Sequence, residues 1–166
     1  MNKKLKKLRK LYALCIAMLL TVSVVGCGSG QTQPVQTEPA VSQENGGTLG
    51  DSRVEIGDFL LTKTYEGKDA IVINMNFTNN SDDAKSYMSA LMSTAYQDGV
   101  ELSTAIIIDD TVYDSDSQMK ELKKGASINV QVAYELSNIT SDVEFEVEEF
   151  LSFSNSKLEK TFVISE

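Results

Sequence analysis

The 166-residue chain carries 24 acidic and 15 basic residues, which give a formal net charge of −9, and it contains no histidine. Because histidine is the usual base that activates a serine or cysteine nucleophile, this composition excludes the histidine-dependent triads. The negative charge also argues against nucleic acids as partners, since an acidic surface repels their phosphate backbone.

The first 26 residues have the order of a secretory signal peptide. A basic head with six lysines and arginines precedes an apolar stretch over residues 11–25. As a helix, this stretch extends about 22 Å, which is shorter than the roughly 30 Å hydrocarbon core of a bilayer. Residues 1–26 are therefore predicted to be a targeting segment and not a membrane span.

A cysteine follows this segment directly. The run Val24, Val25, Gly26, Cys27 resembles the lipobox of bacterial lipoproteins, in which the cysteine thiol receives a diacylglyceryl group before cleavage. The sequence thus predicts that Cys27 becomes the lipidated N-terminus of the mature chain. Two acyl chains meet the two-signal requirement for stable attachment, so we expect a protein anchored to the cell membrane and facing the exterior. The alternative is a protein secreted without an anchor.

Removal of the signal peptide makes the chain more acidic. Six basic residues leave and all acidic ones remain, so 9 basic residues face 24 acidic ones, a net charge of −15. Such a charge favours cationic partners. Cys15 leaves with the signal peptide and Cys27 carries the lipid, so the folded part cannot depend on disulfides.

Residues 27–52 are expected to be the lipidated N-terminus and a flexible linker. They contain both prolines of the chain, many Gln, Thr, Ser and Gly residues, and no aromatic residue. Chains of this composition behave as flexible tethers. The root-mean-square reach expected for this length is about 25–30 Å.

Residues 53–166 are predicted to form one all-β domain, an immunoglobulin-like antiparallel β-sandwich of about seven strands. Apolar and polar residues alternate in 71–77 and 128–136, as in half-buried strands. In 143–148 the alternating residues are glutamates, which we expect on a solvated strand face and not in a catalytic cluster. The predicted strands are 54–63, 70–78, 87–97, 100–108, 126–136, 143–153 and 160–164.

Three local signals complete the predicted order of elements. Asp98-Gly99 lies between two apolar runs and is the strongest hairpin signal in the chain. Residues 86–97 contain alanines and methionines that also suit a helix, but we interpret them as a strand. A short helical turn is expected around residues 117–122.

Four stretches of this domain carry a family resemblance. They are TKTYEGKDAIVINMNFTNNSDDA, YQDGVEL, YDSDSQMKELKKGASINVQVAYEL and DVEFEVEEF. Together they are similar to the Gram-positive lipoprotein modules named domain of unknown function 5067, over nearly the whole of residues 53–166. The resemblance implies an immunoglobulin-like fold in a Gram-positive cell envelope. It implies no catalytic residue, because that family has no established activity.

One acidic loop permits a metal hypothesis. Its four carboxylates follow the apolar run 105–108, and they belong to Asp109, Asp110, Asp114 and Asp116. Carboxylate oxygens are ligands that calcium prefers, but Met119 stands where the EF-hand spacing requires glycine. Three lysines just beyond the loop can neutralise it without an ion. A calcium site and a charge-balanced loop therefore both remain open.

These features predict a membrane-anchored extracytoplasmic lipoprotein, a monomer that presents an immunoglobulin-like module to an unknown protein or peptide ligand. We expect no catalytic activity and no cofactor. One alternative is a calcium-stabilised binding module that uses the loop from Asp109 to Asp116. Another is an enzyme, which would depend on carboxylates, lysine or tyrosine alone because histidine and tryptophan are absent.

Overall fold

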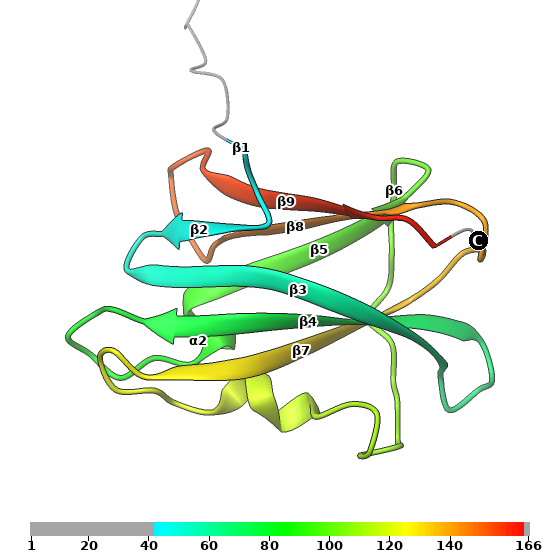
Figure 1. The fold of residues 1–166 in the computed structure, drawn as a ribbon, viewed down its shortest axis with the longest axis horizontal. Coiled ribbons are helices and arrows are strands. Elements are labelled where there is room, and N and C mark those ends of the chain that lie inside the picture. Colours follow the sequence, from blue (N-terminus) through cyan, green and yellow to red (C-terminus); the bar gives the residue numbers. More distant parts are fainter. Residues whose placement is uncertain (1–41, 165–166) are drawn as a thin grey trace, which may run out of the picture. The chain divides into compact units, whose positions relative to one another are not determined.

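Two β-sheets pack face to face in the computed structural model, which describes residues 42–164 (Figure 1). The first sheet contains, in order, β2 (Gly46–Leu49), β3 (Ser52–Lys63), β4 (Asp69–Asn79) and β7 (Ser127–Glu135). The second sheet contains β1 (Ser42–Glu44), β9 (Lys157–Phe162), β8 (Val143–Glu149), β5 (Leu91–Gln97) and β6 (Val100–Glu101). The predicted all-β sandwich is confirmed. The signal peptide, the lipobox and Cys27 lie outside the described residues.

The core between the sheets is built from the alternating residues of these strands. Ile71 and Phe77 of β4 and Phe145 of β8 are fully buried there. The glutamates of β8 point away from this core, as predicted, since Glu144 and Glu148 are exposed. The hairpin prediction is also confirmed, because Asp98 and Gly99 join β5 to β6 with φ angles of 52° and 75°.

Residues 42–49, predicted to belong to the linker, lie in the sheets instead. β1 pairs in parallel with β9, and β2 pairs antiparallel with β3, so the chain passes from one sheet to the other at Asn45. Leu49 is buried in the core, which gives β2 an apolar contact. The linker therefore does not include these residues. This segment has too few apolar residues to show a strand period.

Two predicted strands are only partly correct. In the predicted strand 87–97, residues 87–90 form the short helix α2 (Tyr87–Ala90), which begins where Ser86 and Ser89 exchange backbone-to-hydroxyl hydrogen bonds. The predicted strand 100–108 ends at Glu101, and the rest leaves the second sheet. This segment touches the first sheet instead, where the Ala105 N–H donates to the Ala133 carbonyl at 2.9 Å.

The remaining boundaries shift by a few residues. β8 ends at Glu149, so residues 150–153 lie in a loop and not in the predicted strand 143–153. β9 begins at Lys157, before the predicted start at residue 160. The predicted helical turn is a 3₁₀ helix, η1 (Ser115–Met119), slightly earlier in the chain. Among residues 42–164, no helix has the length and apolar character needed to cross a membrane.

A second apolar cluster lies on the outer face of the first sheet. Ala70 and Val72 of β4 and Ala133 of β7 pack there against Ala105 and Tyr113. The segment that connects β6 to η1 therefore crosses over one half of this face. The other half stays open to solvent, and it contains the candidate site.

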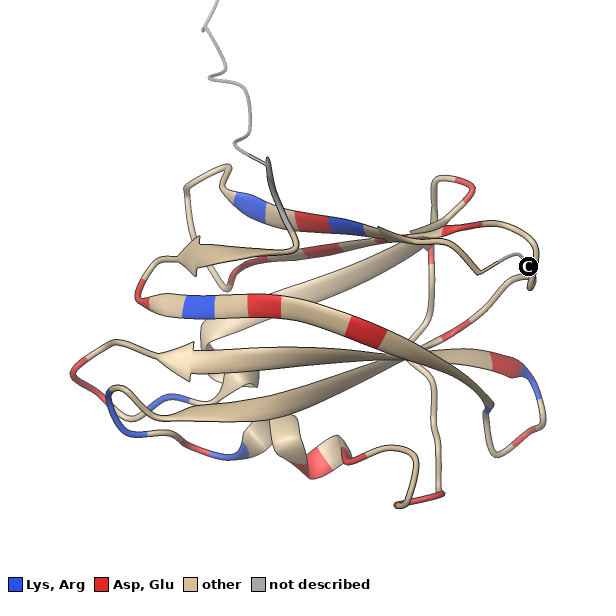
Figure 2. Cartoon of the chain, in the orientation of Figure 1, with Lys and Arg blue, Asp and Glu red and all other residues tan. Residues whose placement is uncertain are grey.

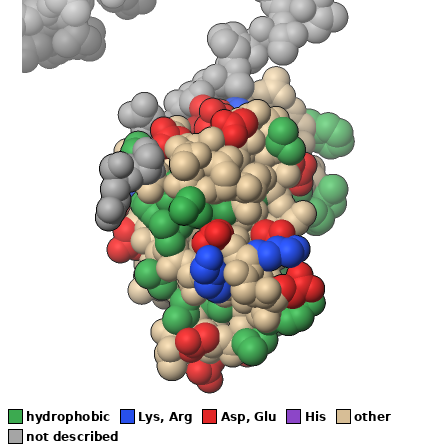
Figure 3. Space-filling model, turned by 90° about the vertical axis from the view of Figure 1, so that its right-hand side faces the viewer, with side chains coloured by type: hydrophobic (Ala, Val, Ile, Leu, Met, Phe, Trp, Pro, Cys, Tyr) green, Lys and Arg blue, Asp and Glu red, His purple; other side chains and the backbone are tan. Residues whose placement is uncertain are grey.

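Charged side chains are spread over the strands and loops of the sandwich (Figure 2). At the end that contains the β3–β4 hairpin, the Lys68 ammonium lies 3.2 Å from a Glu66 oxygen and 2.9 Å from a Glu135 oxygen. Figure 3 shows basic and acidic side chains side by side at this end. We call it the hairpin end.

An inward-facing lysine in the second sheet forms hydrogen bonds to the first sheet at the edge of the sandwich. Lys160 of β9 is paired with Phe145, on the core side of the strand, and its Nζ lies 5.1 Å from the Phe162 ring centroid. The ammonium donates to the carbonyls of Ile56 and Gly57 in β3, at 3.2 and 2.6 Å. These two carbonyls lie where β3 shifts its register against β4. Lys160 thus ties the second sheet to an irregular part of the first.

The substitution Lys160→Met keeps the apolar stem and removes both charge-assisted hydrogen bonds. We expect the free energy of unfolding to fall by about 1.5–3 kcal/mol in urea titrations. Lys63→Met is the matched control, because the Lys63–Asp69 ion pair is exposed and such pairs contribute at most about 1 kcal/mol. Equal losses in the two variants would contradict the role assigned to Lys160.

Candidate functional site

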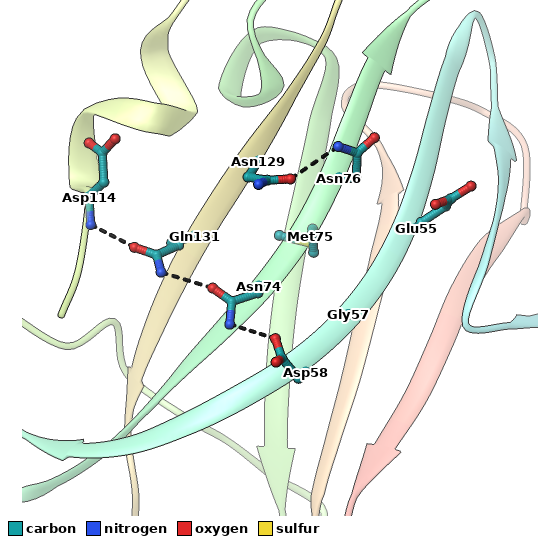
Figure 4. A pocket seen from close by; sticks show the side chains of 9 residues that line it. All are labelled: Glu55, Gly57, Asp58, Asn74, Met75, Asn76, Asp114, Asn129 and Gln131. Atoms are coloured by element: carbon teal, nitrogen blue, oxygen red, sulfur yellow. Dashed lines mark hydrogen bonds between the residues drawn. The ribbon is translucent and has the colours of Figure 1, made fainter.

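A depression of about 530 Å³ lies on the open half of the outer face of the first sheet (Figure 4). Its floor is formed by β3, β4 and β7, and the residue before η1 lies at one side. Most of the lining side chains are amides or carboxylates. The lining residues are Glu55, Gly57, Asp58, Asn74, Met75, Asn76, Asp114, Asn129 and Gln131.

The strand register places the amide side chains in pairs. Asn74 of β4 is opposite Gln131 of β7, and Asn76 is opposite Asn129. Side chains at directly opposite positions project on the same face and contact each other. Asn76 accordingly donates to the Asn129 side-chain oxygen at 3.1 Å. We call these four residues the amide row.

A continuous chain of hydrogen bonds orients part of the amide row (Figure 4). The Asp114 backbone N–H donates to Gln131 Oε1 at 2.7 Å, and Gln131 Nε2 donates to Asn74 Oδ1 at 2.8 Å. Asn74 Nδ2 then donates to Asp58 Oδ1 at 2.7 Å. Each side-chain amide carries two N–H groups, and this chain uses one of each. The row therefore presents oriented donors to a ligand.

A β-bulge brings the carboxylate of Asp58 to the end of this chain. The register of β3 against β4 shifts between Ile56 and Phe59. Bulges of this kind redirect a side chain from its regular position. Gly57 permits the close approach of the strands, because a Cβ atom at this position would lie 3.0 Å from the Asn74 carbonyl oxygen. The bulge thus adds a negative charge beside the amides.

The acidic loop contributes one residue to the depression. Asp114 lies at its rim, whereas Asp109, Asp110 and Asp116 do not line it. Asp114 caps η1, since its Oδ1 accepts from the Asp116 and Ser117 N–H groups, both at 3.1 Å. Of the four predicted metal-ligand candidates, only Asp114 therefore lines the depression.

Two of the four loop carboxylates have partners from the protein itself. Asp114 Oδ2 accepts from Lys120 Nζ at 3.0 Å, and this hydrogen bond lowers the pKa of Asp114. Asp109 Oδ1 accepts from the Thr111 hydroxyl at 2.6 Å, which lowers the pKa of Asp109. Within residues 42–164, no group of three or more His, Cys, Asp or Glu side chains is arranged to hold a metal ion. The calcium alternative stays a prediction.

The amide row was not identified from the sequence as a site. In the sequence, these four residues are only polar positions of two alternating runs: Asn74, Asn76, Asn129 and Gln131. The signal in the sequence is that four polar positions of these runs are amides, while Glu135 occupies another. Which amide meets which depends on the register between strands far apart in the chain. That register cannot be obtained from one sequence.

Comparisons with known proteins agree with this fold. The family model described as domain of unknown function (DUF5067) matches residues 29–149. No curated protein matches the chain. Similar solved structures include a candidate lipoprotein from Staphylococcus aureus, with 17% identity over 72% of this chain and 92% of that chain and a TM-score of 0.55.

Two further structures are similar at comparable levels. A protein from Enterococcus faecalis has 18% identity over 73% of this chain and 90% of that chain, with a TM-score of 0.52. An uncharacterised β-sandwich protein from Clostridium difficile has 14% identity over 78% of this chain and 99% of that chain, with a TM-score of 0.57. At these identities, the similarity concerns the fold.

The calcium alternative can be tested on the chain from residue 28 onward. We expect its melting temperature to differ by less than about 2 °C between excess calcium and EDTA, because both carboxylate oxygens of Asp114 already accept hydrogen bonds. An ion at about a hundred times its dissociation constant stabilises a protein by roughly 2.7 kcal/mol, which raises the melting temperature by several degrees. A rise of that size, lost in Asp114→Asn, would establish a calcium site.

Proposed function

The chain belongs to the domain of unknown function 5067 family, and we propose that it is a lipid-anchored extracytoplasmic module that binds a protein or peptide. The observation that carries this proposal is the amide row on the open outer face of the first sheet. Three strands hold the row in place, and hydrogen bonds orient its side chains. A fixed set of polar groups binds a ligand without the entropy cost of ordering them first.

The chemistry of the depression favours a peptide-like ligand with a basic group. Amide side chains both donate and accept hydrogen bonds, so they match the groups of a peptide backbone. Glu55 and Asp58 lie at one side of the row, and Asp114 lies at the other. Glu55 is paired with Arg53. Asp114 is paired with Lys120, whereas Asp58 accepts, within the described residues, only from a neutral amide of the row. With a mature net charge of −15 predicted from the sequence, Asp58 is therefore the carboxylate that attracts a lysine or arginine side chain of the ligand.

The direction in which carboxyl pKa values are shifted supports a binding function over acid–base catalysis. Among the described residues, Glu66, Asp109 and Asp114 have lowered pKa values, because hydrogen bonds favour their charged forms. A general acid that works near neutral pH needs the opposite shift, a raised carboxyl pKa. The proposed module therefore uses its carboxylates as fixed charges for recognition.

Two observations support the anchor. The lipobox ends at Cys27 directly after a segment with the order of a signal peptide. A structurally similar Staphylococcus aureus protein is described as a candidate lipoprotein. Two acyl chains on Cys27 hold such a module at the membrane without a membrane-spanning helix.

Replacement of Cys27 tests the anchor. Without the thiol no diacylglyceryl group can be attached, so Cys27→Ala should move most of the protein from the membrane fraction to the culture medium. Immunoblots of the two fractions measure this distribution, and Cys15→Ala in the signal peptide is the matched control. A Cys27→Ala protein that stays with the membrane as fully as the wild type refutes the anchor.

Site-directed photo-cross-linking tests the binding face. A photoreactive amino acid replaces Asn129 in the amide row or, as control, Glu144, which is equally exposed on the outer face of the second sheet. After irradiation of whole cells, we expect a discrete covalent adduct from position 129 and none from position 144. Equal adducts from the two faces, or an adduct from position 144 alone, rule out the amide row as the binding surface.

A further inference from the structure

The loop between β8 and β9, residues 150–156, exposes three large apolar side chains at one end of the sandwich. The exposed fractions are 47% for Phe150, 83% for Leu151 and 105% for Phe153. Large apolar side chains that gather on the surface of a soluble domain mark contact sites. This loop is therefore a candidate contact surface, separate from the amide row.

One exposed methionine lies beside this loop. The Phe150 N–H donates to the Ala90 carbonyl at 2.9 Å, which joins the loop to the end of α2. Met92 of β5 is paired with Glu148, two residues before Phe150, and it is exposed. We call the resulting surface the apolar tip, and its members are Met92, Phe150, Leu151 and Phe153.

The loop has a defined conformation that does not favour leucine. Leu151 has a φ of 58°, in the left-handed region that glycine adopts most readily. Hydrogen bonds hold the next residues, since the Ser152 N–H donates to the Glu149 carbonyl and the Ser154 N–H donates to the Ser152 hydroxyl. Backbone geometry therefore does not account for a leucine at position 151, and neither does core packing.

The chain that comes from Cys27 enters the domain next to the apolar tip. β1 begins at Ser42, which pairs with Lys157, the first residue of β9 after the loop (Figure 1). Residues 28–41 number 14, so they can span at most about 50 Å. A lipid on Cys27 therefore keeps this end of the sandwich within about 50 Å of the bilayer.

We propose that the apolar tip inserts into the headgroup region of the membrane that holds the lipid anchor. This inference rests on the proposed lipid anchor. The tether raises the local concentration of the tip at the bilayer, so a small apolar surface is sufficient for the contact. Because the domain is acidic, the contact depends on the apolar side chains and not on attraction to anionic headgroups. The hairpin end, with its paired charges, then faces away from the membrane.

A single tryptophan reports the contact, because the natural chain contains none. The chain from Cys27 onward has one thiol, which is joined to a maleimide-bearing lipid in phosphatidylcholine vesicles. We expect the fluorescence of Phe153→Trp to fall by more than half when the acyl chains are brominated. Tyr65→Trp is the matched control, since Tyr65 is an exposed aromatic residue of the hairpin end, and its fluorescence should stay unchanged. Quenching of Phe153→Trp no greater than that of Tyr65→Trp overturns the proposal.

A second variant separates membrane contact from folding. Leu151→Gly in the Phe153→Trp chain relieves the unfavourable backbone angle, so the melting temperature should hold or rise while the quenching decreases. The tryptophan emission of Phe153→Trp is also recorded without lipid. A blue shift of this emission that grows with protein concentration shows that a second copy covers the apolar tip, and it overturns the proposal. In the vesicle experiment the lipid is attached chemically, so the quenching does not depend on whether cells lipidate Cys27. The Cys27→Ala experiment tests lipidation in cells separately.

Discussion

The outer face of β4 changes from apolar to polar halfway along the strand, and this change determines where the following chain lies. Ala70 and Val72 are fully buried, so a further layer of chain must cover them. The segment with Ala105 and Tyr113 provides this layer, which removes apolar surface from water. From Asn74 onward, the outer side chains of β4 are polar, and burial without partners would cost free energy there. The covering chain therefore stops, and the depression begins where it ends.

The segment that connects β6 to η1 also forms the rim of the site. It delivers the Asp114 N–H to Gln131, which starts the chain of hydrogen bonds along the amide row. The Ser117 hydroxyl then accepts from the Gln131 backbone N–H at 3.1 Å, at the edge strand of the first sheet. Edge strands with unpaired backbone groups promote unwanted pairing with other chains. One irregular segment thus covers apolar surface, protects an edge and orients the polar side chains.

The sequence predicts the sheet-forming runs well, because burial of one face imposes a period of two on residues such as 71–77 and 143–147. It fails at 100–108, where an apolar run covers a sheet instead of joining one. It also fails at 42–49, where pairing depends on backbone hydrogen bonds and on Leu49 alone. The amide row depends on contacts between residues 57 positions apart, such as Asn74 and Gln131, which only the register reveals. The acidic loop was visible as a charge cluster, but its role as a helix cap was not.

The link between the crossing segment and the amide row can be measured directly by hydrogen exchange of the Asp114 N–H. This amide belongs to a loop, and its partner is the side chain of Gln131. In the wild-type chain, slow exchange of this N–H is expected. In Gln131→Ala, exchange of Asp114 should accelerate while that of Ala105, which is bonded to the β7 backbone, stays slow. The contrary result is an Asp114 N–H that, in the wild type, exchanges as fast as an unprotected loop amide. That result would contradict both the placement of the segment between β6 and η1 over the first sheet and the ordered amide row.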